Sequence, residues 1–313
     1  MTLGNGNIVV DLQKWLVAYL QEVSNKNLSA RTMDIYRRIL EDFIEYARGY
    51  QGEAGMEDIN RLFLNGYLSD RANNAKSFGP STKQLHITVL KTFFTYITEN
   101  NSNNHDFEKM FRKMKVKTEI KEKPAISEKD ITKLLNFLEK MKKEPRNRLI
   151  NCRNSLLCKT LLYSGLRVHE LLPYRIMDFK MVEDEGVYSL LVLGKGSKER
   201  FVYIPIDMIT DELETIRDER GEAWPVCSTR NNTIINRSNL WTIMTGIFRR
   251  AGVDQTGLHI LRHTFARRLV NSNTNLKTIS ELLGHSDVSI TAKFYAKTNE
   301  DNKRKAVASL VSK

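Results

Sequence analysis

Residues 259–266 read His-Ile-Leu-Arg-His-Thr-Phe-Ala, and residues 165–170 read Gly-Leu-Arg-Val-His-Glu. The first stretch places His259 and Arg262 three residues apart, which on a helix puts both side chains on one face. The second places Arg167 just after a glycine that ends one helix, where the next helix begins. Together they predict a site where two arginines and a histidine meet.

Further candidate residues lie between and after these two stretches. Val187–Leu193 and Phe201–Ile206 are β-rich runs, and they predict a hairpin whose basic, glycine-containing turn spans 194–200. Residues 282–286 then read Leu-Leu-Gly-His-Ser, and residues 291–295 read Thr-Ala-Lys-Phe-Tyr. The chain thus adds a lysine-bearing turn, another histidine and a tyrosine.

This set of residues suits the cleavage of a phosphodiester by a protein hydroxyl. The charge that builds on the non-bridging oxygens needs fixed cations, the nucleophile must lose a proton, and the leaving 5′ oxygen must gain one. A tyrosine has an ordinary pKa of about 10, so it needs a strongly positive site to react near neutrality. Two arginines, a proton donor on a loop and histidines meet these needs.

In this order and combination, the stretches resemble the tyrosine recombinase (integrase) family. That family shares G-L-R-x-x-E, a lysine in a β-turn, H-x-L-R-H-[TS]-F-A, L-G-H-S and a following tyrosine. Every element occurs here between Gly165 and Tyr295. Lys297 stands where many relatives carry histidine, a departure that touches no catalytic role. For the first hundred residues the resemblance rests only on a helical pattern that looks like the family's core-binding domain.

The resemblance implies a role for each matching residue. Two arginines would clamp the scissile phosphate, and two histidines would hydrogen-bond its oxygens or assist proton movement. A lysine at the hairpin tip would protonate the leaving oxygen, with Lys198 as the fallback, and an acidic residue would orient the arginine and histidine side chains. The implied catalytic set is Arg167, Lys195, His259, Arg262, His285 and Tyr295, with Glu170 in support. Taken singly, each of these residues also fits a surface charge or a packed side chain.

Composition bounds the class of protein. The 313 residues include 41% hydrophobic ones, enough for packed cores, and carry a net charge of +12. A basic excess favours polyanionic partners, although it also serves solubility. The chain has no apolar run long enough for a membrane span and no signal peptide. Its three cysteines show no zinc or disulfide spacing. We therefore expect a cytoplasmic protein without metal or cofactor.

The predicted fold is mainly α with a small β-sheet, in which a helical N-terminal bundle precedes an α+β DNA breaking-rejoining domain. Residues 8–105 would form the core-binding domain, 106–126 a basic linker and 127–313 the catalytic domain. The linker is either simply solvated or a strap along a phosphate backbone, or both. Predicted helix starts include Ser29, Ser81 with Gln84 in a capping box, and Ser127 with Asp130.

The expected function is site-specific recombination through a 3′-phosphotyrosyl intermediate and a four-way (Holliday) junction. The partner would be double-stranded DNA carrying the recombination site. The enzyme would act as a homotetramer, or a heterotetramer with a paralogue, whose subunits exchange their C-terminal segments. The absence of a separate arm-site domain favours a short, Xer-type enzyme, acting in chromosome-dimer resolution or as a simple mobile-element integrase. The alternatives are a type IB topoisomerase and a DNA-binding module that no longer cuts.

Overall fold

The computed structural model describes residues 1–295 apart from positions 5, 27, 51–54, 76, 117–123, 195–198, 256 and 286. At positions 290 and 293–295 it describes the backbone alone. The chain divides into two compact units, Met1–Glu119 and Ile120–Lys313. Each unit has its own hydrophobic core.

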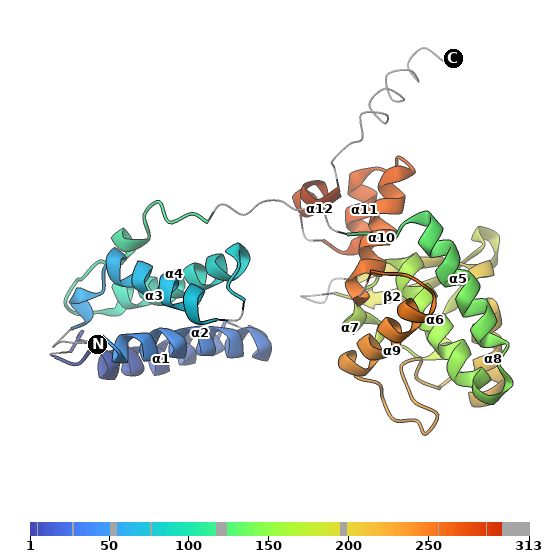
Figure 1. The fold of residues 1–313 in the computed structure, drawn as a ribbon, viewed down its shortest axis with the longest axis horizontal. Coiled ribbons are helices and arrows are strands. Elements are labelled where there is room, and N and C mark those ends of the chain that lie inside the picture. Colours follow the sequence, from blue (N-terminus) through green and yellow to red (C-terminus); the bar gives the residue numbers. More distant parts are fainter. Residues whose placement is uncertain are drawn as a thin grey trace, which may run out of the picture. The chain divides into compact units, whose positions relative to one another are not determined.

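The described part of the first unit is helical (Figure 1). Its elements are α1 (Ile8–Ser24), α2 (Ala30–Arg48), the 3-10 helix η1 (Met56–Asp58), α3 (Arg61–Asn74), α4 (Pro80–Asn100) and the 3-10 helix η2 (Glu108–Phe111). Aromatic rings fill the core between them, and Phe43 and Tyr67 are wholly buried. These two rings meet edge to face with centroids 5.1 Å apart, a favourable geometry.

Two of the predicted helix starts are confirmed. Ser29 caps α2, because its hydroxyl accepts a hydrogen bond from the backbone N–H of Thr32 at 3.2 Å. Ser127 caps the first helix of the second unit, α5 (Glu128–Lys142), in the same way, accepting from the N–H of Asp130 at 3.1 Å. Both serines satisfy an N–H group that has no partner within its helix.

The predicted capping box of Ser81 and Gln84 is wrong. α4 begins at Pro80 with Gly79 as its N-cap and has no side-chain cap. Proline suits this position, because its φ is already helical and it has no N–H to satisfy. The side chain of Gln84 instead accepts a hydrogen bond from the backbone N–H of Val116 at 3.4 Å.

The first part of the predicted linker 106–126 packs onto the first unit. Phe107 and Phe111 are 2% and 7% exposed and belong to its core. These residues are therefore anchored, because their rings are removed from water. Residues 117–123 lie outside the described part of the chain. The extents of the two domains remain predictions.

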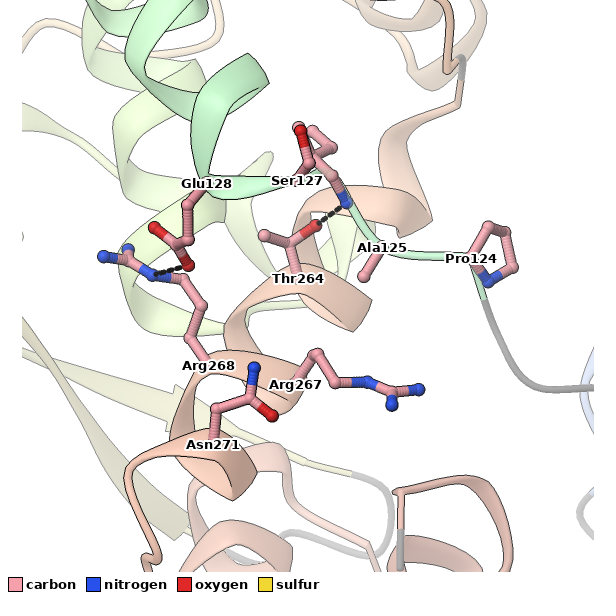
Figure 2. Close-up of a pocket in the computed structure, with 9 residues that line it drawn as sticks. Pro124, Ala125, Ser127, Glu128, Thr264, Arg267, Arg268 and Asn271 are labelled. Atoms are coloured by element: carbon pink, nitrogen blue, oxygen red, sulfur yellow. Dashed lines mark hydrogen bonds and ion pairs between the residues drawn. The ribbon is translucent and has the colours of Figure 1, made fainter. Parts of the chain in front are cut away.

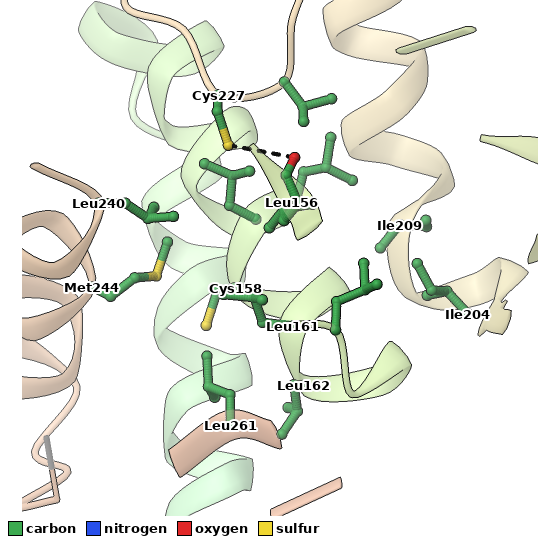
Figure 3. Close-up of a cluster of buried hydrophobic side chains, with 14 of the residues drawn as sticks. Leu156, Cys158, Leu161, Leu162, Ile204, Ile209, Cys227, Leu240, Met244 and Leu261 are labelled. Carbon is green, nitrogen blue, oxygen red and sulfur yellow. Dashed lines mark hydrogen bonds between the residues drawn. The ribbon is translucent and has the colours of Figure 1, made fainter. Parts of the chain in front are cut away.

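The second unit surrounds one central helix. Its elements are α5 (Glu128–Lys142), η3 (Pro145–Asn147), α6 (Arg148–Ser164), α7 (Val168–Leu171), η4 (Ile176–Asp178), β1 (Lys180–Val182), η5 (Glu183–Glu185), β2 (Val187–Leu193), β3 (Glu199–Pro205), α8 (Ile206–Arg220), α9 (Arg237–Arg250), α10 (Leu258–Asn271), α11 (Leu276–Leu283) and α12 (Val288–Tyr295). α6 contacts α5, α8, α9, α10 and β3. Leu156 and Leu161 on α6 are wholly buried among side chains from several of these elements (Figure 3).

A buried ionic cluster fixes α6 against its neighbours. Glu212 on α8 is 1% exposed, and its carboxylate accepts hydrogen bonds from Lys159 at 2.6 Å and Ser155 at 2.7 Å. Lys159 also donates to Glu139 on α5 at 2.7 Å. Because a buried charge is stable only when it is paired, the cluster holds α5, α6 and α8 in register.

The sheet is antiparallel, with strand order β1-β2-β3. Leu193 pairs with Glu199, so residues 194–198 connect the two strands. The predicted hairpin is confirmed, although β3 begins two residues earlier than expected and β1 was not predicted. With helices covering a small sheet, the predicted fold class, mainly α with a small β-sheet, is confirmed.

Other sequence expectations concern thiols and membranes. Cys152, Cys158 and Cys227 are buried and unpaired, as expected of packed thiols. Within the described residues, no helix combines the length and the apolar character that crossing a bilayer requires.

Candidate active site

Arg167 is the N-cap of α7 and follows directly after the turn that ends α6. Gly165 makes that turn in the left-handed conformation, with φ of 65°. The backbone N–H of Arg167 donates to Oε2 of Glu170 at 2.7 Å, and its Nη1 donates to Oε1 at 3.0 Å. A single carboxylate therefore holds both the main chain and the side chain of Arg167.

Arg262 comes from the first half of α10 and is 6% exposed. Its Nη1 donates to the carbonyl oxygen of Gly165 at 2.6 Å, and its Nη2 donates to that of Leu283 at 2.6 Å. Nη2 also lies 3.2 Å from Nε2 of His285. Folding thus brings α10, the end of α6 and the end of α11 together around one guanidinium.

Three arginines converge on the C-terminal end of α11. Arg200 donates through Nε to the carbonyl oxygen of Leu282 at 3.1 Å. Arg262 donates to the next carbonyl, as described above, and Nη2 of Arg167 donates to that of Gly284 at 3.2 Å. The last carbonyls of a helix have no partner within it and carry the negative end of its dipole. They therefore suit a cluster of guanidinium groups.

Glu170 is the carboxylate within this cluster. Its side chain is 4% exposed and accepts hydrogen bonds from Arg200 at 2.8 and 3.2 Å, in addition to those from Arg167. Burial raises the pKa of the Glu170 carboxyl, but the hydrogen bonds and charges of Arg200 and Arg167 outweigh burial and leave the pKa lowered. Glu170 is thus ionised. Because the cluster at the end of α11 holds three guanidiniums and one carboxylate, the site is positive.

His285 joins the arginine cluster to α12. An arginine only donates, so Nε2 of His285 accepts the hydrogen bond from Arg262. The proton of the neutral ring then lies on Nδ1, which is 2.8 Å from the hydroxyl of the wholly buried Thr291. Burial, with the charges of Arg262, Arg167 and Arg200, lowers the pKa of His285 to about 4. The ring is therefore neutral near pH 7.

His259 lies at the exposed start of α10, whereas Arg262 on the same helix is buried. Nε2 of His259 is 3.3 Å from Nη2 of Arg237, the first residue of α9. Partial burial and the charges of Arg237 and Arg262 lower the pKa of His259. Because an arginine only donates, Nε2 of the neutral His259 ring accepts the hydrogen bond from Arg237.

Thr264 anchors the chain that enters this unit. Its hydroxyl accepts a 2.9 Å hydrogen bond from the backbone N–H of Ile126, just before α5 (Figure 2). Nearby, Arg268 pairs with Glu128 at 3.1 Å, so α10 is tied to the start of α5 at two points. α10 also carries Arg262, so the same helix holds the entering segment and the site.

Two predicted catalytic residues are only partly located. Lys195 lies outside the described residues, in the turn between β2 and β3. Tyr295 is the last residue of α12, and the structure describes its backbone but not its side chain. The described residues that come together are therefore Arg167, Glu170, Arg262 and His285, with His259 near them.

The match to known sequences decides the family. The model of the phage integrase family matches residues 124–302. The chain belongs to the phage integrase family. The matched region contains each residue of the predicted catalytic set, and the family agrees with the resemblance to tyrosine recombinases noted in the sequence.

Curated members of the family resemble the chain over most of its length. It is 26% identical to the tyrosine recombinase XerD of Oceanobacillus iheyensis over 278 residues, which cover 85% of this chain and 87% of that protein. It is 27% identical to the tyrosine recombinase XerC of Bacillus pumilus over 305 residues, covering 94% and 93%. The protein is thus an Xer-like tyrosine site-specific recombinase, and the topoisomerase alternative is not favoured.

Solved structures of the family share the fold. The pre-cleavage complex of the XerH site-specific recombinase bound to difH substrate aligns with a TM-score of 0.77 and 21% identity, covering 100% of this chain and 99% of that one. A λ integrase fragment in a dimer bound to a COC′ core site aligns with a TM-score of 0.64 and 18% identity, covering 90% and 94%.

Two residues of this recombinase site were missed in the sequence. Arg200 was expected within the hairpin turn 194–200 and given no role, but it lies on β3 with its side chain 12% exposed. The alternation of a strand contains the signal, because buried Val202 and Ile204 put Arg200 on the same face. Arg237 gave no such signal, since its contact with His259 joins two separate helices.

Proposed function

We propose that Tyr295 is the nucleophile that cuts one strand at a double-stranded recombination site. Its phenolic oxygen attacks the scissile phosphorus, which forms a 3′-phosphotyrosyl bond and releases a 5′ hydroxyl. The observation that supports this proposal is the convergence of three guanidiniums on the end of α11, those of Arg167, Arg200 and Arg262. The next helix, α12, ends at Tyr295. It is bonded to this cluster through His285 and Thr291.

In this proposal Arg167 and Arg262 bind the two non-bridging oxygens. A guanidinium stays charged and donates in a fixed plane, so it suits an oxyanion that gains charge in the transition state. The positive potential of the cluster also lowers the pKa of a nearby phenol, which has an ordinary value of about 10. His259 supplies a neutral imidazole beside the phosphate that either donates a hydrogen bond or assists proton movement, and His285 has the same assigned role.

The leaving group also needs a proton. Lys195, at the tip of the hairpin, would donate it to the 5′ oxygen as the phosphorus–oxygen bond breaks. The freed hydroxyl of the partner duplex then attacks the phosphotyrosine, regenerates the phenol and joins the strands. Two such rounds pass through a Holliday junction. Each step exchanges one phosphoester for another, so the scheme uses no ATP.

The proposal extends to assembly. Two DNA sites would be held by four subunits, either identical or from two paralogues, with the first and second units of each chain clamping a duplex. The subunits would exchange the segment 296–313, which lies outside the described residues. A cyclic assembly of this kind uses head-to-tail contacts that close on themselves. The enzyme would act in the cytoplasm.

The decisive experiment uses a suicide substrate, a duplex nicked next to the scissile phosphate so that the short 5′ product diffuses away. Wild-type protein is expected to accumulate a covalent adduct that survives denaturation, and Tyr295→Phe is expected to form none. Tyr203→Phe, which removes an exposed hydroxyl on β3, is the matched control and should react like wild type. An adduct that persists in Tyr295→Phe, or no adduct with wild type on any site, contradicts the proposal.

A further inference from the structure

Arg200 is bound more completely than a residue in a solvated turn would be. Nε donates to the carbonyl oxygen of Leu282, and Nη1 and Nη2 donate to the two oxygens of Glu170. Every nitrogen of the guanidinium therefore has a protein acceptor, at 2.8 to 3.2 Å. With only 12% of the side chain exposed, Arg200 faces the protein interior.

This geometry distinguishes Arg200 from Arg167. The side chain of Arg167 is 31% exposed, so it is open to solvent, from which a phosphate can approach. Burial alone does not separate the arginines, because Arg262 is 6% exposed. Arg200 differs because its fork is closed on a carboxylate that is 4% exposed. A bidentate arginine–carboxylate pair fixes orientation as well as charge. Arg200 therefore sets the position of Glu170, and Glu170 sets that of Arg167.

The backbone at Gly284 is shaped around Arg200. Gly284 has φ of 62°, a left-handed conformation that favours glycine. A Cβ at this position would lie 2.7 Å from Nη1 of Arg200. The glycine thus allows the guanidinium to lie against the main chain just before His285. Arg200 touches both the α11 end and the α7 carboxylate.

The position of Arg200 on the strand adds a third connection. It is the second residue of β3 and follows directly from the turn that contains Lys195. Its contacts therefore join the base of the hairpin to α7 and α11. The segments that supply two proposed catalytic residues, Arg167 and His285, therefore meet at one side chain.

We propose that Arg200 is a positioning residue for DNA cleavage, which holds Glu170, and through it Arg167, in register with the end of α11. This inference rests on the proposed function of the site. It requires the planar fork and its three acceptors, not only a positive charge. Lysine keeps the charge but offers a single nitrogen, so it does not replace the fork.

The test compares Arg200→Lys and Arg200→Met with wild type and with Arg217→Met. Arg217 on α8 forms an ion pair with Glu222 at 3.1 Å and lies outside the site, so its variant controls for the loss of an arginine. For each protein the melting temperature, the Kd for an intact site at several salt concentrations, and the single-turnover rate of adduct formation are measured. Adduct formation by wild type and by Tyr295→Phe is measured in the same assay. That comparison tests the proposed nucleophile separately from the role of Arg200.

Arg200→Lys is expected to slow adduct formation by about tenfold or more, the effect of losing charge-assisted hydrogen bonds. Its Kd and the dependence of Kd on salt should match wild type, because no phosphate contact is lost. Wild-type cleavage by a folded Arg200→Lys overturns the inference. So does a rate loss that parallels a weaker Kd with a shallower salt dependence, because that result assigns Arg200 to the phosphate.

Gly284→Ala provides an independent variant if Arg200→Met does not fold. The added methyl group displaces the guanidinium without removing it, so cleavage should slow while Kd stays unchanged. Equal cleavage by Gly284→Ala and wild type, with both folded at the assay temperature, contradicts the inference.

Discussion

The guanidinium of Arg262 donates a 2.6 Å hydrogen bond to the carbonyl oxygen of Gly165. This contact joins the helix of the H-x-L-R-H stretch to the turn of the G-L-R stretch, which are almost a hundred residues apart in the chain. Gly165 therefore does more than end α6. It presents an acceptor to Arg262 and starts the turn that leads to Arg167, the two arginines proposed to bind the phosphate.

Gly165→Ala should damage both the fold and the site. The residue has φ of 65°, and a Cβ would clash with the ring of Phe265. Left-handed strain and overpacking each cost about 1–3 kcal/mol. We expect a clearly lower free energy of unfolding in urea and slower adduct formation. Gly186→Ala, also left-handed but with open space around its Cβ, isolates the strain. Equal losses in the two variants would argue against a packing role for Gly165.

Glu170→Gln should destabilise the second unit strongly. The carboxylate lies 4% exposed between Arg167 and Arg200, and glutamine leaves these two cations without their anion. Removing one partner from a buried ion pair costs about 3–5 kcal/mol. Urea unfolding followed by circular dichroism measures the loss. Glu281→Gln on α11, whose pair with Lys277 is exposed at 4.0 Å, should change stability little. A Glu170→Gln protein as stable as wild type would show that the arginines do not need this charge.

The sequence predicted the site residues better than the contacts between them. His259, Arg262 and His285 stand in a recognisable order, so their clustering followed from the family pattern. The acceptors that orient the arginines are backbone carbonyls of residues 282–284, and any residue type supplies a carbonyl. No sequence pattern therefore indicates that three guanidiniums donate hydrogen bonds to three consecutive backbone carbonyls.

Local signals also set the limits of the fold prediction. The Ser29 cap predicted the start of α2 correctly. α4, in contrast, begins at Pro80 with Gly79 as its N-cap, and not with a capping box at Ser81. β3 starts at Glu199, earlier than its apolar residues indicated, because charged residues pair in a ladder without showing β propensity. α8 (Ile206–Arg220) has no counterpart among the predicted helices.

The pKa of His285 predicts how stability depends on pH. Its value is about 4 in the folded protein against an ordinary 6.5. The unfolded chain therefore binds a proton at a higher pH than the folded chain does, and protonation favours unfolding. This contribution to stability is complete above pH 6.5 and declines as the pH falls from 6.5 to about 4. The lowered pKa of His259 acts in the same direction.

Melting temperatures measured from pH 7 down to 4.5 test this prediction. Wild type should lose stability across the range, and His285→Gln should lose less, because glutamine still accepts from Arg262 but does not titrate. The carboxyl of Glu170, with its lowered pKa, stabilises the fold above its ordinary value of 4.5, so its contribution is lost only at lower pH. Parallel curves for wild type and His285→Gln would show that this histidine does not control the acid response.

Thr291→Val should separate cleavage from DNA binding. Valine keeps the shape of the buried side chain but removes the hydroxyl that bonds Nδ1 of His285 at 2.8 Å. α12 would lose its polar connection to the arginine cluster just before Tyr295. A hydrogen bond of about 1 kcal/mol corresponds to about a fivefold slower adduct formation. Because no charge changes, the Kd for the site and its salt dependence should stay at wild-type values.

Thr132→Val on α5 is the matched control, since its hydroxyl bonds the carbonyl of Glu128 at 3.0 Å on an exposed helix surface. It should cleave at the wild-type rate. If Thr291→Val also does so while folded, the link between His285 and α12 does not contribute to placing the nucleophile.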